Sequence, residues 1–127
     1  ADSLSDLFMA ALEGMVRLIS GSPPLFKEAE TENEKFILTA DSLEDLLVDW
    51  LSEMIFHIQV NRKIPDAIFQ LSVFEENNHK KLTAKVNFKP LETRESENFS
   101  EIKAVTYHHL SIVKNQDEYS TVIIFDV

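Results

Sequence analysis

The fold of this chain is decided by residues 101–110, EIKAVTYHHL, and by the closing residues 122–127, VIIFDV. Both segments are rich in β-branched and aromatic side chains, which favours strands. Between them, residues 114–118 (KNQDE) are polar and predict a turn. Two strands joined by such a turn form an antiparallel hairpin, so we expect residues 101–110 to pair with residues 122–127.

Side chains of a strand alternate between two faces, and this alternation sorts the polar residues of the expected hairpin. One face would carry Glu101, Lys103, Val105, Tyr107 and His109, and the other Ile102, Ala104, Thr106, His108 and Leu110. The antiparallel arrangement brings Glu101 and Lys103 towards Asp126 in the partner strand. A carboxylate and an ammonium would then meet at one end of a sheet, either as a site or as ordinary charges on a sheet edge.

Composition indicates a single domain spanning residues 1–127. A chain of 127 residues with 44% hydrophobic content is long enough to bury roughly two thirds of its unfolded surface. Twenty-two acidic against twelve basic residues give a formal net charge of −10 and a pI near 4.7. Such a charge repels phosphate backbones, so we expect no direct nucleic-acid binding by the protein alone and favour partners with basic surfaces.

Several classes of protein are disfavoured by what the sequence lacks. It has no cysteine, which excludes disulfides and thiolate metal sites. It has no apolar run near the roughly 18 residues of a membrane span, and its start does not resemble a signal peptide, so we expect a cytoplasmic protein without a membrane contact. Glycine-rich phosphate loops and the HExxH, G-x-S-x-G and EF-hand patterns are also missing from the sequence.

Two amphipathic helices are predicted. Ser3, with Asp6 three residues later, predicts the start of the first, and residues 20–24 (SGSPP) predict its end, because glycine suits a left-handed cap and proline cannot continue a helix. Its apolar stripe comprises Leu4, Leu7, Phe8, Ala11, Met15, Leu18 and Ile19. Asp41 and Ser42 predict the start of the second helix. Its stripe comprises Leu43, Leu46, Leu47, Trp50, Leu51, Met54, Ile55 and Ile58, with Glu44, Asp45, Asp49 and Glu53 opposite and His57 as a favourable charge near its end.

Strands are predicted in the rest of the chain. The acidic residues 28–34 read as a solvated connection to a short strand over residues 35–39. From Ala67 the apolar period becomes two, and the polar residues 75–80 predict a turn between two strands with one apolar face. That face would hold Phe69, Leu71 and Val73 on one strand and Leu82, Ala84, Val86 and Phe88 on the other. The predicted fold class is therefore α+β, with two helices packed on a mostly antiparallel sheet.

The closing segments resemble the C-terminal signature of the archease family, through EIKAVTYH at residues 101–108 and IIFDV at residues 123–127. Residues 3–8 and 41–51 resemble the family's two helix starts. Archeases are small accessory proteins that assist the RtcB-type RNA ligase in tRNA splicing and RNA repair. The resemblance implies an archease-like fold and an activator of an RNA ligase rather than an enzyme.

The resemblance also implies roles for individual residues. Asp126 matches a near-terminal aspartate that belongs to a carboxylate cluster binding a divalent cation, and such hard oxygen ligands suit calcium or magnesium. Lys103 matches the lysine of the family's Glu-Val/Ile-Lys-Ala motif, whose ammonium can hold ligands or meet a phosphate. Glu101, Thr106 and His108 match as well and are expected to be supporting or ligase-facing residues.

The sequence departs from the family pattern at two positions. The family's first strand carries a His-Thr-Ala-Asp motif that would precede Ala1, and we expect a leading segment to supply it. Ser20 stands where the family places an aspartate. Two other functions therefore stay open: a metal-independent, chaperone-like interaction module, and an enzyme with Lys103 or His108 as general base and Asp126 as electrostatic partner.

Overall fold

Both predicted helices are present and begin at the predicted caps. The computed structural model describes residues 1–21, 25–26, 33–90 and 102–126. Helix α1 (Leu4–Ser20) starts where the Ser3 hydroxyl accepts a hydrogen bond from the Asp6 N–H at 3.0 Å, and α2 (Leu43–Gln59) starts with the same bond between Ser42 and Asp45. Helix α1 ends at Gly21, whose φ of 82° is the left-handed conformation that glycine adopts at little cost. None of the described helices is long and apolar enough to cross a membrane.

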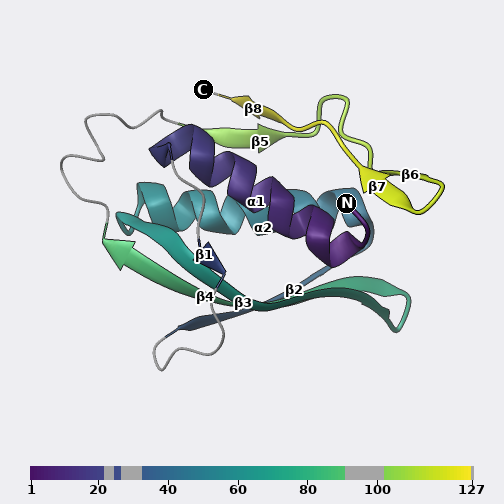
Figure 1. Ribbon diagram of the computed structural model, residues 1–127, viewed down its shortest axis with the longest axis horizontal. Helices are drawn as coiled ribbons and strands as arrows, with labels where there is room; N and C mark the ends of the chain where they lie inside the picture. The colour runs from purple at the N-terminus through teal and green to yellow at the C-terminus, as the bar shows by residue number, and fades with distance from the viewer. Residues whose placement is uncertain (22–24, 27–32, 91–101, 127) are drawn as a thin grey trace.

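A four-stranded sheet covers one side of the two helices (Figure 1). Its strands are β1 (Leu25–Phe26), β2 (Glu34–Ala40), β3 (Lys63–Glu76) and β4 (His79–Pro90), in the order β1-β3-β4-β2. The antiparallel β3–β4 pair confirms the predicted hairpin, and β2 pairs with β4 in the same sense. The two-residue β1 pairs in parallel with β3, an element that sequence patterns did not predict.

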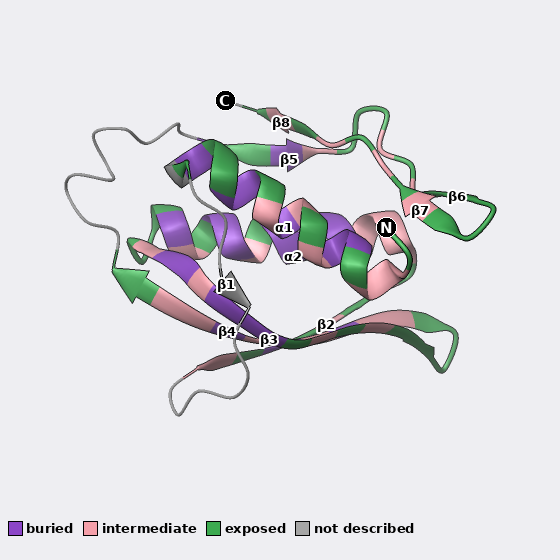
Figure 2. Ribbon diagram, viewed as in Figure 1, coloured by how far each residue is buried: buried purple, intermediate pink, exposed green. Residues whose placement is uncertain are grey.

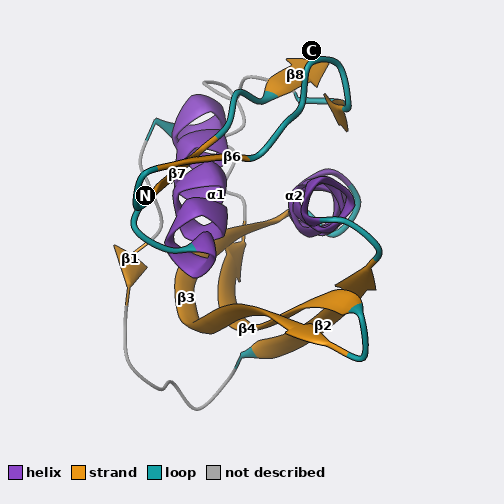
Figure 3. Ribbon diagram, turned by 90° about the vertical axis from the view of Figure 1, so that its right-hand side faces the viewer, coloured by secondary structure: helices purple, strands orange, loops and turns teal. Residues whose placement is uncertain are grey.

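The C-terminal residues form two small antiparallel pairs on the other side of the helices. Strand β5 (Ala104–Thr106) pairs with β8 (Ile124–Asp126), and β6 (Val113–Asn115) pairs with β7 (Glu118–Ser120). The helices therefore lie between the four-stranded sheet and the β5–β8 pair, as Figures 1 and 3 show from two directions. The α+β class is confirmed, with the addition that the helices are covered on both sides.

The predicted pairing of the closing segments is confirmed, but the prediction of one continuous strand over residues 101–110 is wrong. The strand stops at Thr106, and the chain then turns, with the Leu110 N–H donating to the Tyr107 carbonyl at 3.0 Å. His109 within this turn has a φ of 57°. This turn over residues 107–110 lies between β5 and β6, so the hairpin divides into two short pairs.

The core lies between the helices and the four-stranded sheet, with a contribution from β5 (Figure 2). Trp50 is at its centre, fully buried, with its indole N–H donating to the Phe8 carbonyl at 3.3 Å. The predicted stripe of α2 is buried as expected, apart from the half-buried Leu43. Leu18 of α1 is 60% exposed, so its assignment to the core was wrong. It lies about 100° around the helix from Ile19, at the edge of the buried stripe.

Bulges explain why β3 departs from the predicted alternation. Ile68 and its neighbour Phe69 are both buried, although strict alternation places Ile68 opposite the apolar face. The β3–β4 register shifts between Phe69 and Ser72, and Gln70 has a φ of 51°. The extra residue rotates the strand, so that Ile68 faces the core before the bulge and Leu71 and Val73 face it afterwards.

Candidate functional site

The structure brings Lys103 and Asp126 together, as the antiparallel pairing predicts. Asp126 pairs with Ala104 in the β5–β8 ladder, and the Lys103 N–H donates to the Asp126 carbonyl at 2.7 Å. Both side chains are exposed. This contact joins the two backbones, and this end of the β5–β8 pair therefore exposes an ammonium and a carboxylate on adjacent strands.

Helix α2 holds this end of the pair in place. The Gln59 side-chain amide donates to the Ile102 carbonyl, and both Ile102 and Val105 are buried in the core. The prediction that Ile102 and Val105 lie on opposite faces was wrong. Side chains alternate between faces only within a strand, and Ile102 precedes Ala104, the first residue of β5. The backbone at Ile102 is held instead by the hydrogen bond from Gln59. The buried side chains of Ile102 and Val105 therefore fix the backbone position of Lys103, whose own side chain is exposed.

A small pocket of about 220 Å³ lies beside Lys103. Lys103 and Ala104 line it together with residues of one α2 face: Ser52, Ile55, Phe56, Gln59 and Val60. Its walls are mostly apolar, with one cationic group at the lining. Such a surface can accept a small anionic group, because an ammonium attracts it and the apolar walls weaken the screening of that charge by water.

The other predicted residues do not join this pair. Thr106 lies at the opposite end of β5, in register with Ile124, and its hydroxyl accepts a hydrogen bond from the His108 N–H at 3.3 Å. The exposed His108 lies in the turn beyond, with its ring 4.0 Å from that of His109. Thr106 therefore supports a turn, and His108 is exposed within that turn. Glu101 and the side chain of Ser20 lie outside the described residues.

A complete cation site cannot be assembled from the described part of the chain. Asp126 supplies one carboxylate, and the described residues contain no group of three or more His, Cys, Asp or Glu side chains arranged to hold a metal ion. Calcium and magnesium take about six or more oxygen ligands. The described residues therefore supply one oxygen ligand group of such a site and not the complete set.

The sequence predicted the acidic side chains of α2 but not their contact with Tyr107. Asp45 and Asp49 are one helical turn apart, a spacing visible in the sequence. Partial burial raises the pKa of Asp49, and repulsion from Asp45 adds to the effect. Loss of solvent also raises the pKa of Tyr107, which is raised further by its hydrogen bond to Asp45 and by the charges of Asp45 and Asp49. The contact between Asp45 and Tyr107 depends on the turn after β5, and no sequence pattern predicted that turn.

His57 is in the last turn of α2, as predicted, but it faces other side chains more than water. Its side chain is 12% exposed and lies against the rings of Phe88, at 4.7 Å between centroids, and Phe36, at 5.5 Å. Its Nε2 is 3.6 Å from Oε2 of Glu34, and the other carboxylate oxygen, Oε1, accepts from the Lys63 ammonium at 2.7 Å. The imidazole therefore closes one end of the core beside an ion pair.

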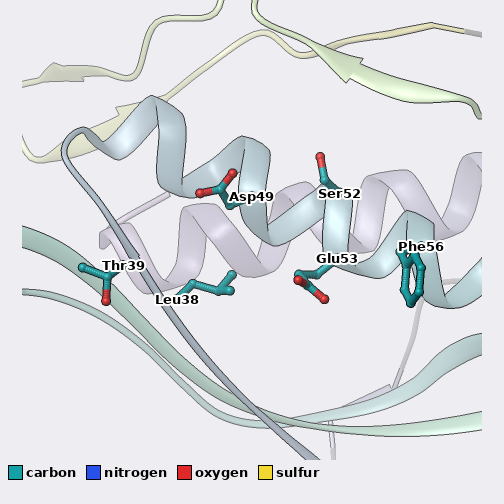
Figure 4. Close-up of a pocket in the computed structure, with 6 residues that line it drawn as sticks. All are labelled: Leu38, Thr39, Asp49, Ser52, Glu53 and Phe56. Atoms are coloured by element: carbon teal, nitrogen blue, oxygen red, sulfur yellow. The ribbon is translucent and has the colours of Figure 1, made fainter.

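A groove of about 440 Å³ lies between α2 and β2 (Figure 4). Its lining residues are Leu38, Thr39, Asp49, Ser52, Glu53 and Phe56. In the close-up, Glu53 and Phe56 point from α2 towards β2. The groove and the Lys103 pocket share Ser52 and Phe56, so α2 separates two concave surfaces.

The fold and the site define an α+β protein in which two helices lie between a mostly antiparallel four-stranded sheet and a small antiparallel strand pair, with Lys103 and Asp126 exposed at one end of that pair. The family model of the Archease protein family (MTH1598/TM1083) matches residues 1–127. The chain therefore belongs to the Archease family, which confirms the resemblance of its closing segments.

Individual relatives agree. Protein archease of Methanosarcina barkeri is 33% identical over 98 residues, which are 77% of this chain and 66% of the relative, just under two thirds of its length. Protein archease of Methanosarcina mazei is 26% identical over 126 residues, covering 99% of this chain and 84% of the relative. The solution structure of protein 1598 from Methanobacterium thermoautotrophicum has a TM-score of 0.68 at 22% identity, covering 97% of this chain and 85% of that chain. At this identity the structural likeness supports the shared fold.

Proposed function

We propose that this chain is an accessory protein that activates an RtcB-type RNA ligase, promoting guanylylation and multiple turnover in tRNA splicing and RNA repair. The observation that carries the proposal is the backbone contact between the exposed residues Lys103 and Asp126, with Lys103 lining a mostly apolar pocket, in a chain of the Archease family. The described lining of the Lys103 pocket includes one hydroxyl, that of Ser52, and no histidine or carboxylate that could activate it, which favours an activator over a catalyst.

In this proposal Asp126 contributes to a site for a divalent cation, calcium or magnesium. Its side chain is exposed at the last described position of β8, where other ligands can approach. Since one carboxylate is too few for a hard cation, the remaining oxygen ligands come from outside the described residues or from the ligase.

Lys103 then meets an anionic group of the ligase or of its bound guanylate. An ammonium cannot ligate a cation, so Lys103 acts next to the metal and not on it. Its side chain lines the pocket with apolar residues of α2, where an ion pair is less screened than in open water. Contact through Lys103 should therefore weaken as salt rises.

The test is a multiple-turnover ligation assay. The protein is added to an RtcB-type ligase with GTP, manganese and RNA carrying a 2′,3′-cyclic phosphate end, and joined product per ligase is measured. Stimulation supports the proposal, and product limited to one turnover with and without the protein contradicts it. An Asp117→Asn variant, at the exposed tip of the β6–β7 hairpin, serves as a control that keeps full stimulation.

A metal-independent, chaperone-like interaction module is the second candidate. It is favoured by the single carboxylate at the β5–β8 end of the described structure. Calorimetric titration with calcium separates the two candidates, because only the first expects saturable binding that depends on Asp126. Binding of a client that is unaffected by chelation of divalent ions would favour the second.

A further inference from the structure

Among the strands that the structure describes, β2 presents an open edge. In the described part of the sheet, β2 is the last strand and pairs with β4 alone. Its seven residues keep a continuous register with β4, from Glu34 opposite Val86 to Ala40 opposite Lys80. The backbone groups on its outer side are therefore arranged as a regular template for another strand.

The features that usually protect such an edge are weak in β2. Natural edge strands are commonly short, bulged, or interrupted by proline or several charges. This strand contains no proline and keeps its register, whereas β3 carries two register shifts. Its outward face carries one lysine, Lys35, and an isoleucine, Ile37, that is 56% exposed. An exposed, unbulged edge of this kind favours pairing.

The surroundings of the edge differ on its two faces. On the helix side lies the groove with Leu38 and Phe56 as apolar surface and Asp49 and Glu53 as carboxylates (Figure 4). On the opposite side lies Ile37, since successive side chains of a strand alternate. A strand added to β2 would therefore place one set of side chains near carboxylates and the other set beside an exposed apolar residue.

We propose that the β2 edge and its groove bind an extended basic segment of a partner protein by strand addition. The segment alternates arginine or lysine with valine or isoleucine, so that the basic side chains enter the groove and the apolar ones cover Ile37. Main-chain hydrogen bonds to β2 supply affinity, and the alternation of side chains supplies specificity. Strand β2 lies on the opposite side of α2 from β5, the strand that follows Lys103 (Figure 1), and the proposal is independent of any ligase.

Charge favours this occupant over a second copy of the chain. Each copy carries a formal net charge of −10, and pairing two β2 edges would bring the Asp49 and Glu53 grooves of both copies close together. Like charges that face each other across an interface weaken it. A basic segment instead replaces this repulsion by attraction, most strongly at low ionic strength.

The experiment measures fluorescence polarisation of a labelled peptide, Arg-Val-Arg-Val-Arg-Val-Arg, titrated with the protein. We expect saturable binding that falls at least tenfold for the Asp49→Lys/Glu53→Lys protein. The matched control is Asp117→Lys/Glu118→Lys, at the exposed tip of the β6–β7 hairpin, which makes the same change in net charge and should lose less than threefold. Equal losses in the two variants would reduce binding to general charge attraction and overturn the proposal.

Backbone pairing is tested separately with two peptides N-methylated at alternate residues. Only one edge of the added strand bonds to β2, so one methylated peptide should lose binding and the other should keep it. Amide hydrogen exchange should slow within residues 34–40 when the unmodified peptide is bound. Equal binding of both methylated peptides would contradict strand addition. Sedimentation showing a dimer of the protein alone, removed by Ile37→Lys, would assign the edge to a second copy instead.

Discussion

Replacing Trp50 by alanine should remove a large part of the stability of this protein. Trp50 is fully buried, packs edge-on against Phe36 with 6.1 Å between ring centroids, and donates its indole N–H to the Phe8 carbonyl. Truncation of a buried tryptophan costs about 3–5 kcal/mol, because the surrounding side chains fill the cavity only in part. Total stabilities of small domains are about 5–15 kcal/mol, so Trp50→Ala removes about a third or more of a typical value.

The assay is urea denaturation followed by far-ultraviolet circular dichroism, since Trp50 is the only tryptophan and its fluorescence disappears in the variant. With a slope of about 2 kcal/mol per molar urea, the midpoint should fall by about 1.5–2.5 M. Phe56→Ala is the matched control, because Phe56 lies on the same helix and is 51% exposed. An unchanged midpoint for Trp50→Ala, or an equal fall for Phe56→Ala, would refute the assignment of the core.

Three further predictions concern the proposed cation ligand Asp126, the bulge at Gln70 and the acidic surface of α2. Asp126→Ala should abolish calcium binding in calorimetry and leave the melting temperature near that of the wild type, because its side chain is exposed; a fall of several degrees without metal would mark Asp126 as structural. Gln70→Gly should match or exceed wild-type stability by up to about 1 kcal/mol, whereas Gln70→Val should lose at least about 1 kcal/mol, because φ is 51° there; equal urea midpoints for the two would contradict the bulge. The raised pKa of Asp49 means that its ionised form destabilises the fold, so Asp49→Asn should be more stable than the wild type at pH 7 and lose this advantage as the pH falls through the raised pKa towards 3.8; a difference in urea midpoint that is the same at pH 7 and pH 3 would contradict the cause given for the shift.

Sequence reasoning succeeded where local chemistry decides the structure. Ser3 and Ser42 cap helices whichever fold surrounds them, and the stripe of α2 predicts the burial of Trp50 because helical periodicity persists over 17 residues. The hairpin of β3 and β4 followed from alternation on both sides of a polar turn. These features need no knowledge of distant parts of the chain.

Sequence reasoning failed where contacts between distant residues decide the structure. The bulge at Gln70 reverses the faces of β3, and the turn over residues 107–110 ends the C-terminal strand early. At the candidate site, the closeness of Lys103 and Asp126 could be predicted because antiparallel pairing alone brings them together. The contact of Gln59 with Ile102 joins residues 43 positions apart, and no pattern in either segment indicates it.

The most direct test of the account is the turnover of an RtcB-type ligase with wild-type protein, Lys103→Ala and Asp126→Ala, at equal and saturating divalent cation. The account predicts multiple turnover with the wild type, loss of stimulation with both variants, and calcium binding retained only by the Lys103 variant. Lys103→Arg should rescue in part, because a planar guanidinium does not replace a compact charge. Full stimulation by both alanine variants would reduce the pair to ordinary charges on a sheet edge and contradict the account.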